Sequence, residues 1–264
     1  MTTPLLQQPT PARVVHVSDE NYRTRTLVLD RRLDAQPGQF VMAWLPRLDE
    51  RPFSLAAAEP VALTVAAVGP FSRALHALRP GDTLWLRGPF GRGFTLEPNA
   101  RQPLLVGGGY GVAPLAFLAE HLLAAGQHPT AIVGARTAAD LVGVARLKQL
   151  GLPVIVTTDD GSAGEQSLAS APTARLLASG AADALYGCGP HGLLHALEHL
   201  ARQGAVPAQL SWEARMGCAI GLCGMCEHDD GTLLCLEGPV LPAAVVSPSL
   251  PPTTRCEPLS PTTL

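Results

Sequence analysis

The chain has 264 residues, a hydrophobic content of 47% and a formal net charge of −3. This length allows two or more domains with substantial cores, and the small negative charge gives no basis for binding nucleic acid or an anionic membrane. No uncharged apolar run reaches the ~18 residues of a transmembrane helix, and the N-terminus, M-T-T-P-L-L-Q-Q-P-T, lacks the basic and apolar regions of a signal peptide. We therefore expect a cytoplasmic protein that binds neither nucleic acid nor a membrane.

The first part of the chain predicts a β domain, which we place at residues 1–100. Runs rich in β-branched residues alternate with Pro-Gly and Asp turn signals. Short strands at this spacing favour an antiparallel barrel or sandwich. The expected strands are residues 13–17, 24–29, 39–45, 62–68 and 82–87.

Two stretches of the β domain could bind a diphosphate. Arg51-Pro52-Phe53-Ser54 offers a guanidinium suited to bidentate phosphate binding, although an exposed turn with an ordinary surface Arg is the alternative. Ser72 is expected to cap a helix over residues 73–78, whose first N–H groups could bind a phosphate. A plain strand–turn–helix connection is the alternative there.

From Pro103 the pattern changes to alternating strands and helices, which is typical of a parallel sheet. We place this second domain at residues 101–208. The expected strands are residues 104–106, 130–133, 153–156 and 184–186, and the expected helices are residues 112–125, 138–150, 172–178 and 192–203.

Three loops follow strands of this sheet, so they should lie along one edge, where such sheets bind ligands. They are Gly107-Gly108-Gly109-Tyr110-Gly111, Asp159-Asp160-Gly161 and Cys188-Gly189-Pro190. Glycines allow a bound diphosphate to approach the backbone, and the following helix N-terminus favours its charge. The alternatives are a tight turn without a ligand for the glycine loop and a buried structural cysteine for Cys188.

Four cysteines gather near the end of the chain, at Cys218, Cys223, Cys226 and Cys235. The C-x4-C-x2-C spacing of the first three is that of plant-type [2Fe–2S] sites. A tetrahedral Zn²⁺ site is the alternative, but the small residues in the x4 loop favour an iron–sulfur cradle. His228 is expected to be a solvated neighbour, because a Rieske site needs two histidines. We place this segment at residues 209–242 and predict a disordered tail at 243–264, which contains Cys256.

Together these motifs resemble a known family. R-P-F-S (51–54), G-G-G-Y-G-V-A-P-L (107–115), T-D-D-G-S (158–162), C-G-P (188–190) and S-W-E-A-R-M-G-C-A-I-G-L-C-G-M-C (211–226) occur in this order. Over residues 13–242 the chain resembles the electron-transfer subunits of class 1B dihydroorotate dehydrogenases, within the ferredoxin–NADP reductase superfamily. The resemblance implies an antiparallel FAD-binding β-barrel, a parallel-sheet NAD-binding domain and a small C-terminal [2Fe–2S] segment.

The resemblance also implies roles for individual residues. The cluster would be held by Cys218, Cys223, Cys226 and Cys235, and Cys188 would lie beside the nicotinamide. FAD would contact Arg51, Pro52, Phe53, Ser54, Thr64, Val65, Ala66, Phe71 and Ser72, and NAD(H) would contact Gly107, Gly108, Gly109, Gly111, Asp159, Asp160, Gly189 and Pro190. The chain departs from the family pattern at Phe71, which replaces a glycine, at Ala66, which replaces a basic residue, and in a short link between Cys226 and Cys235.

The function implied is electron transfer between NADH and a partner subunit that carries FMN and interconverts dihydroorotate and orotate, in de novo pyrimidine biosynthesis. Two copies of each subunit would form a heterotetramer. FAD would convert a hydride into single electrons for the cluster. The alternatives are an NAD(P)H–flavin–[2Fe–2S] subunit of a hydrogenase, sulfide or transhydrogenase complex, and a non-catalytic redox sensor. The choice between NADH and NADPH stays open, since Arg136 could contact a 2′-phosphate.

Overall fold

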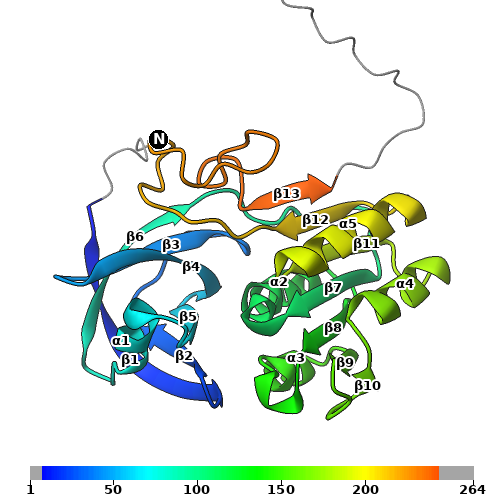
Figure 1. Ribbon diagram of the computed structural model, residues 1–264, viewed down its shortest axis with the longest axis horizontal. Helices are drawn as coiled ribbons and strands as arrows, with labels where there is room; N and C mark the ends of the chain where they lie inside the picture. The colour runs from blue at the N-terminus through cyan, green and yellow to red at the C-terminus, as the bar shows by residue number, and fades with distance from the viewer. Residues whose placement is uncertain (1–7, 244–264) are drawn as a thin grey trace, which may run out of the picture.

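The computed structural model describes residues 8–243. Six antiparallel strands form a closed barrel in the order β1-β2-β5-β4-β3-β6, which confirms the predicted barrel (Figure 1). The strands are β1 (Thr10–Asn21), β2 (Thr24–Leu29), β3 (Phe40–Leu45), β4 (Asp49–Ala58), β5 (Val61–Ala66) and β6 (Thr83–Phe90), and helix α1 (Pro70–His76) follows β5.

Alternation of side chains along the strands builds the barrel core. Leu27 and Leu29 of β2, Leu63 and Val65 of β5 and their neighbours pack inside, fully buried. The sequence analysis missed β4, because Arg51–Ser54 had a turn as its alternative interpretation. The structure places this tetrapeptide within β4, where Arg51 pairs with Ala43 of β3.

The second part of the chain is a seven-stranded sheet with the order β10-β9-β8-β7-β11-β12-β13. All neighbouring strands are parallel except β12 and β13, which are antiparallel. The strands are β7 (Pro103–Gly108), β8 (Thr130–Ala135), β9 (Val154–Thr158), β10 (Glu165–Gln166), β11 (Ala184–Cys188), β12 (Ala208–Ser211) and β13 (Val240–Ala243).

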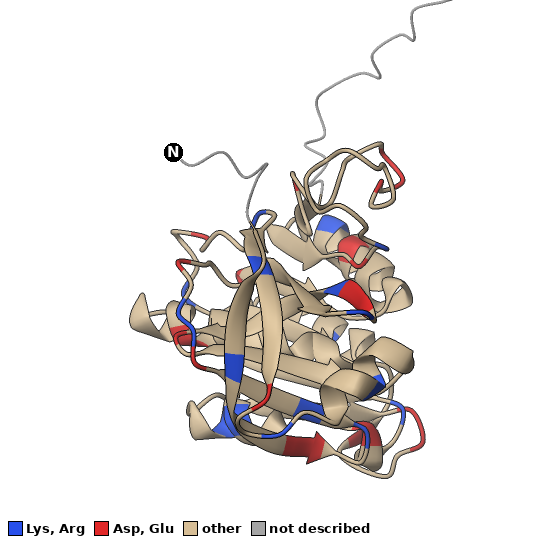
Figure 2. Ribbon diagram, turned by 90° about the vertical axis from the view of Figure 1, so that its left-hand side faces the viewer, with Lys and Arg blue, Asp and Glu red and all other residues tan. Residues whose placement is uncertain are grey.

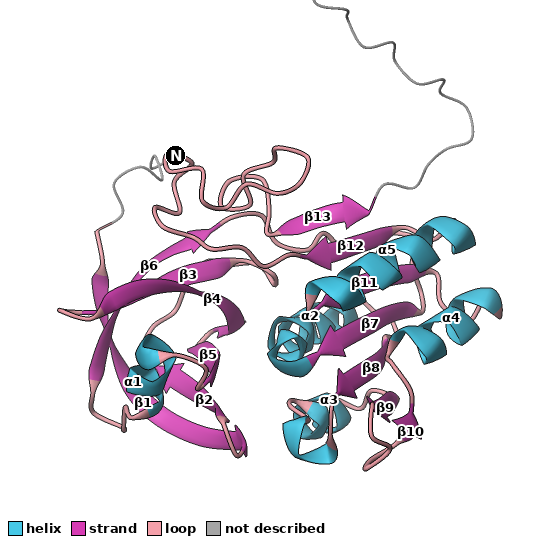
Figure 3. Ribbon diagram, in the orientation of Figure 1, coloured by secondary structure: helices cyan, strands magenta, loops and turns pink. Residues whose placement is uncertain are grey.

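Helices cover both faces of this sheet (Figure 3). They are α2 (Val112–Ala124), α3 (Val144–Gln149), α4 (Ser170–Ala178) and α5 (His191–Gly204), with 3-10 turns η2 (Gly109–Gly111) and η3 (Ala138–Asp140). In β7, Leu104 and Val106 join the core with α4 and α5, whereas Leu105 joins the core with α2 and α3. The predicted helix over 138–150 was too long, because the chain makes a left-handed step at Gly143 (φ +72°) before α3 begins.

The segment between β12 and β13, residues 212–239, has no long helix or strand and contains all four clustered cysteines. We call it the cysteine loop. Both of its ends are anchored in the sheet, so the predicted segment 209–242 includes two sheet strands that the sequence analysis did not foresee. The loop packs on the barrel: Met216, Ala219 and Cys226 share one buried core with Phe40 and Met42 of β3.

In the ribbon of Figure 2, the positions of Lys and Arg are interspersed with those of Asp and Glu. Among residues 8–243, no helix is long and apolar enough to cross a membrane. The predicted disordered tail, including Cys256, lies outside the described residues.

Candidate functional site

A cleft of ≈ 670 Å³ lies between the barrel and the sheet. Its walls come from β4, β5, α1, the start of α2 and the first residues of the cysteine loop. The predicted site residues that line it are Arg51, Pro52, Phe53, Ser54, Thr64, Ala66, Phe71, Ser72, Gly111 and Cys188. Residues that the sequence analysis assigned to two different cofactors therefore meet in one cavity.

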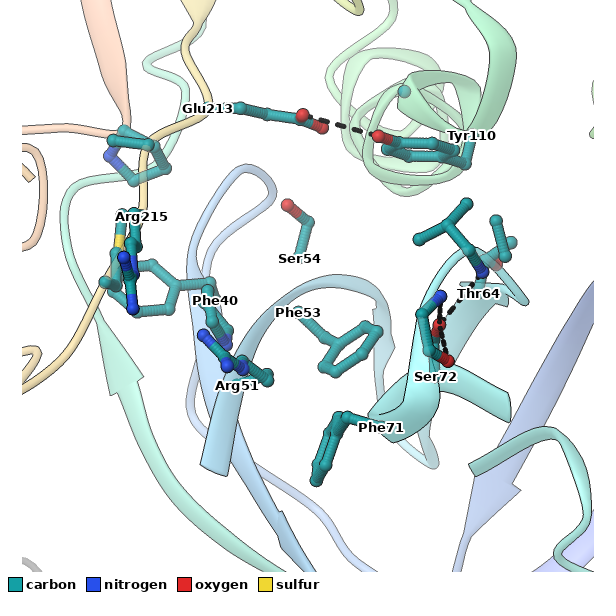
Figure 4. A pocket seen from close by; sticks show the side chains of 18 of the residues that line it. Phe40, Arg51, Phe53, Ser54, Thr64, Phe71, Ser72, Tyr110, Glu213 and Arg215 are labelled. Atoms are coloured by element: carbon teal, nitrogen blue, oxygen red, sulfur yellow. Dashed lines mark hydrogen bonds between the residues drawn. The ribbon is translucent and has the colours of Figure 1, made fainter. Parts of the chain in front are cut away.

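Two arginines lie on the same side of this cleft in Figure 4, Arg51 on the barrel and Arg215 on the cysteine loop. The Arg51 guanidinium lies 2.5 Å from a carboxylate oxygen of Asp49. Both side chains of this pair are partly exposed, so its net contribution to stability is small. An incoming diphosphate can therefore take the place of Asp49 and accept bidentate hydrogen bonds from Arg51.

Helix α1 differs from the prediction at its first turn. Gly69 is the N-cap, and Ser72 lies at the third helical position. The Ser72 Oγ accepts hydrogen bonds from the N–H groups of Val68 and Gly69, at 3.0 and 2.9 Å. Ser72 is therefore not the N-cap, and its hydroxyl stabilises its own turn instead of being left for a ligand.

Two aromatic rings form an apolar wall next to this turn. Phe71 and Phe53 have ring centroids 6.2 Å apart, and both line the cleft. On β5, Thr64 and Ala66 also line it, whereas the Val65 side chain points into the barrel core and is fully buried. Val65 can therefore offer a ligand only its backbone. An apolar wall with a few polar groups suits the flat ring system and polar edge of a flavin.

The glycine loop and the C-G-P loop contact each other at the carboxyl ends of β7 and β11. A Cβ on Gly111 would lie 2.7 Å from the backbone carbon of Cys188, and one on Gly108 would lie 2.8 Å from Pro190 Cδ. Only glycine permits this close approach. The two loops thus form a continuous backbone surface that also includes Gly107, Gly109 and Gly189, none of which lines the cleft itself.

The third predicted loop lies elsewhere on the same edge. Asp159 and Asp160 follow β9, which is separated from β7 by β8. Both residues are exposed and neither lines the cleft. Asp160 accepts hydrogen bonds from the backbone N–H and hydroxyl of Ser162, at 3.0 and 2.6 Å. The structure therefore keeps the D-D-G loop about two strands away from the glycine and C-G-P loops.

Cys188 is 4% exposed and reaches the cleft at the end of β11. Burial raises the pKa of its thiol to about 12, with a further contribution from Glu213, while a hydrogen bond with Ser211 opposes the shift. The thiol is therefore protonated at neutral pH. This environment suits a positioning contact and not a nucleophile, which must be a thiolate.

Tyr110 and Glu213 are functional candidates that the sequence analysis did not single out. The Tyr110 hydroxyl donates to Glu213 Oε2 at 3.4 Å, so this pair spans the cleft from the sheet to the cysteine loop (Figure 4). Partial burial and the Glu213 carboxylate raise the pKa of Tyr110 to about 12. Both residues lie inside quoted motifs, G-G-G-Y-G and S-W-E-A-R-M, but only the fold brings them together.

The four clustered cysteines form two pairs. Cys218 lies within hydrogen-bonding range of Cys223, and Cys235 of Cys226. Among the described residues, no group of three or more Cys, His, Asp or Glu side chains is close enough to hold a single metal ion. Two thiolate pairs fit the two irons of a [2Fe–2S] cluster, each of which takes two protein ligands. A tetrahedral Zn²⁺ would need all four ligands in one shell.

The backbone around Cys218 favours a thiolate. Its sulfur accepts from the N–H groups of Ile220 and Leu222, at 3.4 and 3.3 Å. Burial opposes the charge, but these two N–H groups and that of Cys223 lower the pKa of Cys218 to about 6. A Cβ on Gly217 would lie 3.3 Å from Cys223 Sγ, so the turn is built around the sulfurs. These donors fit a cluster whose sulfurs accept backbone hydrogen bonds.

His228, expected to be a solvated neighbour, is half-buried. Its ring lies 4.6 Å from the Trp212 ring. His228 therefore packs against Trp212 within the cysteine loop.

Comparisons with known proteins agree with this geometry. A family model described as "Iron-sulfur cluster binding domain of dihydroorotate dehydrogenase B" matches residues 213–247. The chain is 40% identical to "Probable dihydroorotate dehydrogenase B (NAD(+)), electron transfer subunit" of Methanothermobacter thermautotrophicus, covering 88% of each chain. It is 35% identical to the protein of the same name from Methanocaldococcus jannaschii, covering 89% of this chain and 90% of that one.

Among solved structures, a chain of the NADH-dependent reduced ferredoxin–NADP oxidoreductase, studied for flavin-based electron bifurcation, is 26% identical. It superposes with a TM-score of 0.79 over 90% of both chains. Phthalate dioxygenase reductase, whose structure is described as transferring electrons from pyridine nucleotides to [2Fe–2S], is 18% identical. Its TM-score of 0.60, over 75% of this chain and 66% of that one, reflects a shared fold.

Proposed function

Because the chain belongs to the family of dihydroorotate dehydrogenase B electron-transfer subunits, we propose that it passes electrons between NAD(H) and a partner subunit, using FAD and a [2Fe–2S] cluster. One observation carries this proposal. The segment that closes the cleft, Trp212–Met216, leads within two residues to Cys218 of the cluster cradle. Flavin cleft and cluster loop are thus covalently adjacent and share one core with the barrel wall.

The barrel side of the cleft would bind FAD. Arg51, assisted by Arg215, would bind its diphosphate, and Phe53 and Phe71 would cover apolar ring surface. The remaining proposed contacts are Pro52, Ser54, Thr64, Ala66, the Val65 backbone and the turn at Ser72. When bound, FAD supplies the conversion between two-electron and one-electron transfer that neither a nicotinamide nor a [2Fe–2S] cluster can perform alone.

The sheet side would bind NAD(H). The surface formed by Gly107–Gly111 and Gly189-Pro190 would receive its diphosphate, and Cys188 would hold the nicotinamide against the barrel side of the cleft. Asp159 and Asp160 would contact a more distant part of the nucleotide. The domain division follows this assignment: residues 1–100 for the flavin, 101–208 for the nucleotide and 209–242 for the cluster.

The partner would be an FMN-containing catalytic subunit that interconverts dihydroorotate and orotate, in a cytoplasmic heterotetramer with two copies of each subunit. Its role would lie in de novo pyrimidine biosynthesis. The exposed side chains beside the cysteines support a docking surface here: Leu222 is 77% exposed, Met225 47% and Leu236 46%. Apolar side chains grouped in this way are typical of protein–protein contacts.

Anaerobic purification of the chain tests the cofactor set. We expect FAD, iron and acid-labile sulfide in fixed ratios to the protein. The sulfide would exclude a zinc site. We also expect NADH to reduce a dye in the presence of the chain. Stoichiometric zinc without sulfide would contradict the cluster. FAD binding without any NADH-dependent dye reduction would instead favour a redox sensor.

Two further measurements test the finer claims. The ratio of kcat/KM for NADH and NADPH identifies the preferred nucleotide. Co-purification identifies the partner: we expect an FMN protein that oxidises dihydroorotate, and capture of a hydrogenase or transhydrogenase subunit would contradict this assignment.

A further inference from the structure

A charged pair lies under the cysteine loop, on the outer wall of the barrel. Arg87 of β6 and Glu50 of β4 form a bidentate ion pair, with Nε–Oε1 and Nη2–Oε2 distances of 2.7 and 2.8 Å. The two side chains are 16% and 24% exposed. Strand β3 runs between β4 and β6, so the pair reaches across it. A partly buried pair of this kind is not needed to close a barrel, and it costs desolvation energy to maintain.

The same guanidinium also contacts the cysteine loop. Arg87 Nη2 donates to the backbone carbonyl of Cys218 at 3.4 Å, and its Cζ lies 5.4 Å from the Phe90 ring centroid. Arg87 therefore contacts both Glu50 and the first cluster cysteine, and its Nη2 donates to both. The hydrogen bond with Glu50, supplemented by the Cys218 sulfur, raises the pKa of Arg87, which carries its charge at every relevant pH.

We propose that Arg87, held in place by Glu50, raises the reduction potential of the cluster bound by Cys218 and its three partners. The inference rests on the proposed function, since it presupposes that cluster. An oxidised cluster with four thiolates is already an anion, and reduction adds one electron to it. A fixed positive charge beside a ligand stabilises the more negative, reduced form.

The negative charge of Glu50 lowers the reduction potential of the cluster, but by less than Arg87 raises it. Its carboxylate accepts two hydrogen bonds from Arg87, and among the described residues the Glu50 side chain makes no hydrogen bond or ion pair with the cysteine loop. Glu50 therefore orients the Arg87 guanidinium and partly offsets its positive charge at the cluster. The barrel that holds the flavin would thereby also set how readily the neighbouring cluster accepts an electron.

The test uses single substitutions that remove each charge while keeping similar shape, in the full chain with its cofactors. The readout is the midpoint potential of the cluster in a redox titration followed by electron paramagnetic resonance. Arg87→Gln should lower the potential, by about tenfold in the reduction equilibrium, or 59 mV for a one-electron couple. Glu50→Gln should raise it, because Arg87 is then uncompensated. The potential of the double variant, which carries Arg87→Gln and Glu50→Gln, should lie between those of the two single variants.

A matched ion pair elsewhere in the chain serves as the control. Arg175 of α4 and Glu165 of β10 are joined by contacts of 2.8 and 2.7 Å, at the edge of the sheet opposite β12 and β13. Arg175→Gln and Glu165→Gln should leave the cluster potential unchanged. These two variants measure how much the cluster potential changes when an ion pair that has no cluster nearby is lost.

Opposite shifts for the two single variants distinguish an electrostatic role from a structural one. Shifts of the same sign, or shifts no larger than those of the control pair, would overturn the inference. If Arg87→Gln does not retain its cluster, Glu50→Gln decides by the direction of its shift, and Arg87→Lys should stay near the wild-type potential. A wild-type chain with FAD but without a cluster would refute the proposed function and this inference together, whereas a cluster with unshifted variants would refute the inference alone.

Discussion

Two cysteines of this chain show how the surroundings determine the chemistry of a residue. Cys188 is buried at the end of β11, and burial raises the pKa of its thiol to about 12. Burial acts on Cys218 too, but backbone N–H donors outweigh it and lower the pKa of its thiol to about 6. Since the thiolate is the reactive form, the two should differ strongly in reactivity.

In the metal-free chain, we expect iodoacetamide to alkylate Cys218 first, with a rate that rises with pH and reaches half its maximum near pH 6. Cys188 should stay unmodified through pH 9, far below its pKa of about 12. Mass spectrometry of peptides after a timed reaction measures both. Alkylation of Cys188 as fast as that of Cys218 would contradict these pKa directions.

The position of Cys188 leads to a second prediction at this scale. Cys188→Ala should slow reduction of the flavin by NADH by roughly 10- to 100-fold, because a small displacement of the reacting groups is costly. Cluster content should not change, since the groups that act on the Cys188 thiol are Glu213 and Ser211 and none of the four cluster cysteines. Stopped-flow absorbance measures the rate. Cys188→Ser, which keeps the side-chain size, should be affected less, and an unchanged rate in the Ala variant would exclude the positioning role.

At the scale of elements, one glycine directly after β6 allows the end of the cysteine loop to pack against the barrel. Gly91 has φ +73°, and a Cβ there would lie 2.8 Å from Pro239 Cδ and collide with the Gly238 carbonyl oxygen. The neighbouring Arg92 N–H donates to that same carbonyl. Gly91 therefore lets the last turn of the loop rest directly on the barrel.

Gly91→Ala should lower the free energy of unfolding and weaken cluster retention. Gly126 has a similar φ of +77° but open space at its Cβ position, which makes Gly126→Ala a matched control. Both variants carry the cost of a left-handed backbone, roughly 1–2 kcal/mol, and Gly91→Ala should lose a further ~1–3 kcal/mol through the clash. Urea unfolding and the ratio of iron to protein measure the two effects, and equal losses in both variants would contradict the clash.

At the scale of the whole molecule, a polar contact joins the barrel to the α/β sheet at the end away from the cysteine loop. Asp140 of η3 accepts hydrogen bonds from the Tyr22 hydroxyl and the Arg23 guanidinium, at 3.0 and 2.9 Å. Thr137 donates to its other oxygen at 3.0 Å. Burial opposes ionisation, but these donors and the charges of Arg23 and Arg136 lower the pKa of Asp140 below 3.8.

Asp140→Asn should reduce the free energy of unfolding by about 1–3 kcal/mol at pH 7, since a charged acceptor is lost. A carboxyl whose folded-state pKa is lowered contributes stability above its unfolded pKa, here 3.8, and loses that contribution as the pH falls through the folded value. The difference in the free energy of unfolding between wild type and Asp140→Asn should therefore disappear as the pH falls through the folded-state pKa of Asp140. Asp34 provides the control, because it is exposed and its side chain makes no hydrogen bond or ion pair within the described part of the chain. Asp34→Asn should change stability by less than ~0.5 kcal/mol.

Much of this architecture could be predicted from local patterns. Alternating β-branched residues predict β2, β3 and β6, and apolar strands followed by glycine turns predict β7 and β11, because burial of one or both faces leaves a periodic record in the sequence. The C-x4-C-x2-C spacing likewise indicates a cluster, since its ligands must come from a short stretch of chain. Local patterns missed β4, whose R-P-F-S stretch has a turn as its alternative interpretation, although its partners β3 and β5 are its neighbours in the chain. They also missed β12 and β13, which pair with each other across the whole cysteine loop.

The sequence by itself determined the order of the modules, the family resemblance and the residue types available at each loop. Only the tertiary structure decided which of them meet. Barrel closure brings Arg87 and Glu50 under Cys218, and the return of the chain after β12 sets Glu213 opposite Tyr110. It also directs the Ser72 hydroxyl into its own turn and keeps Asp159 and Asp160 out of the cleft. The reason is physical: side-chain direction and long-range contact follow from how strands pair and pack, which residue spacing along the chain does not encode.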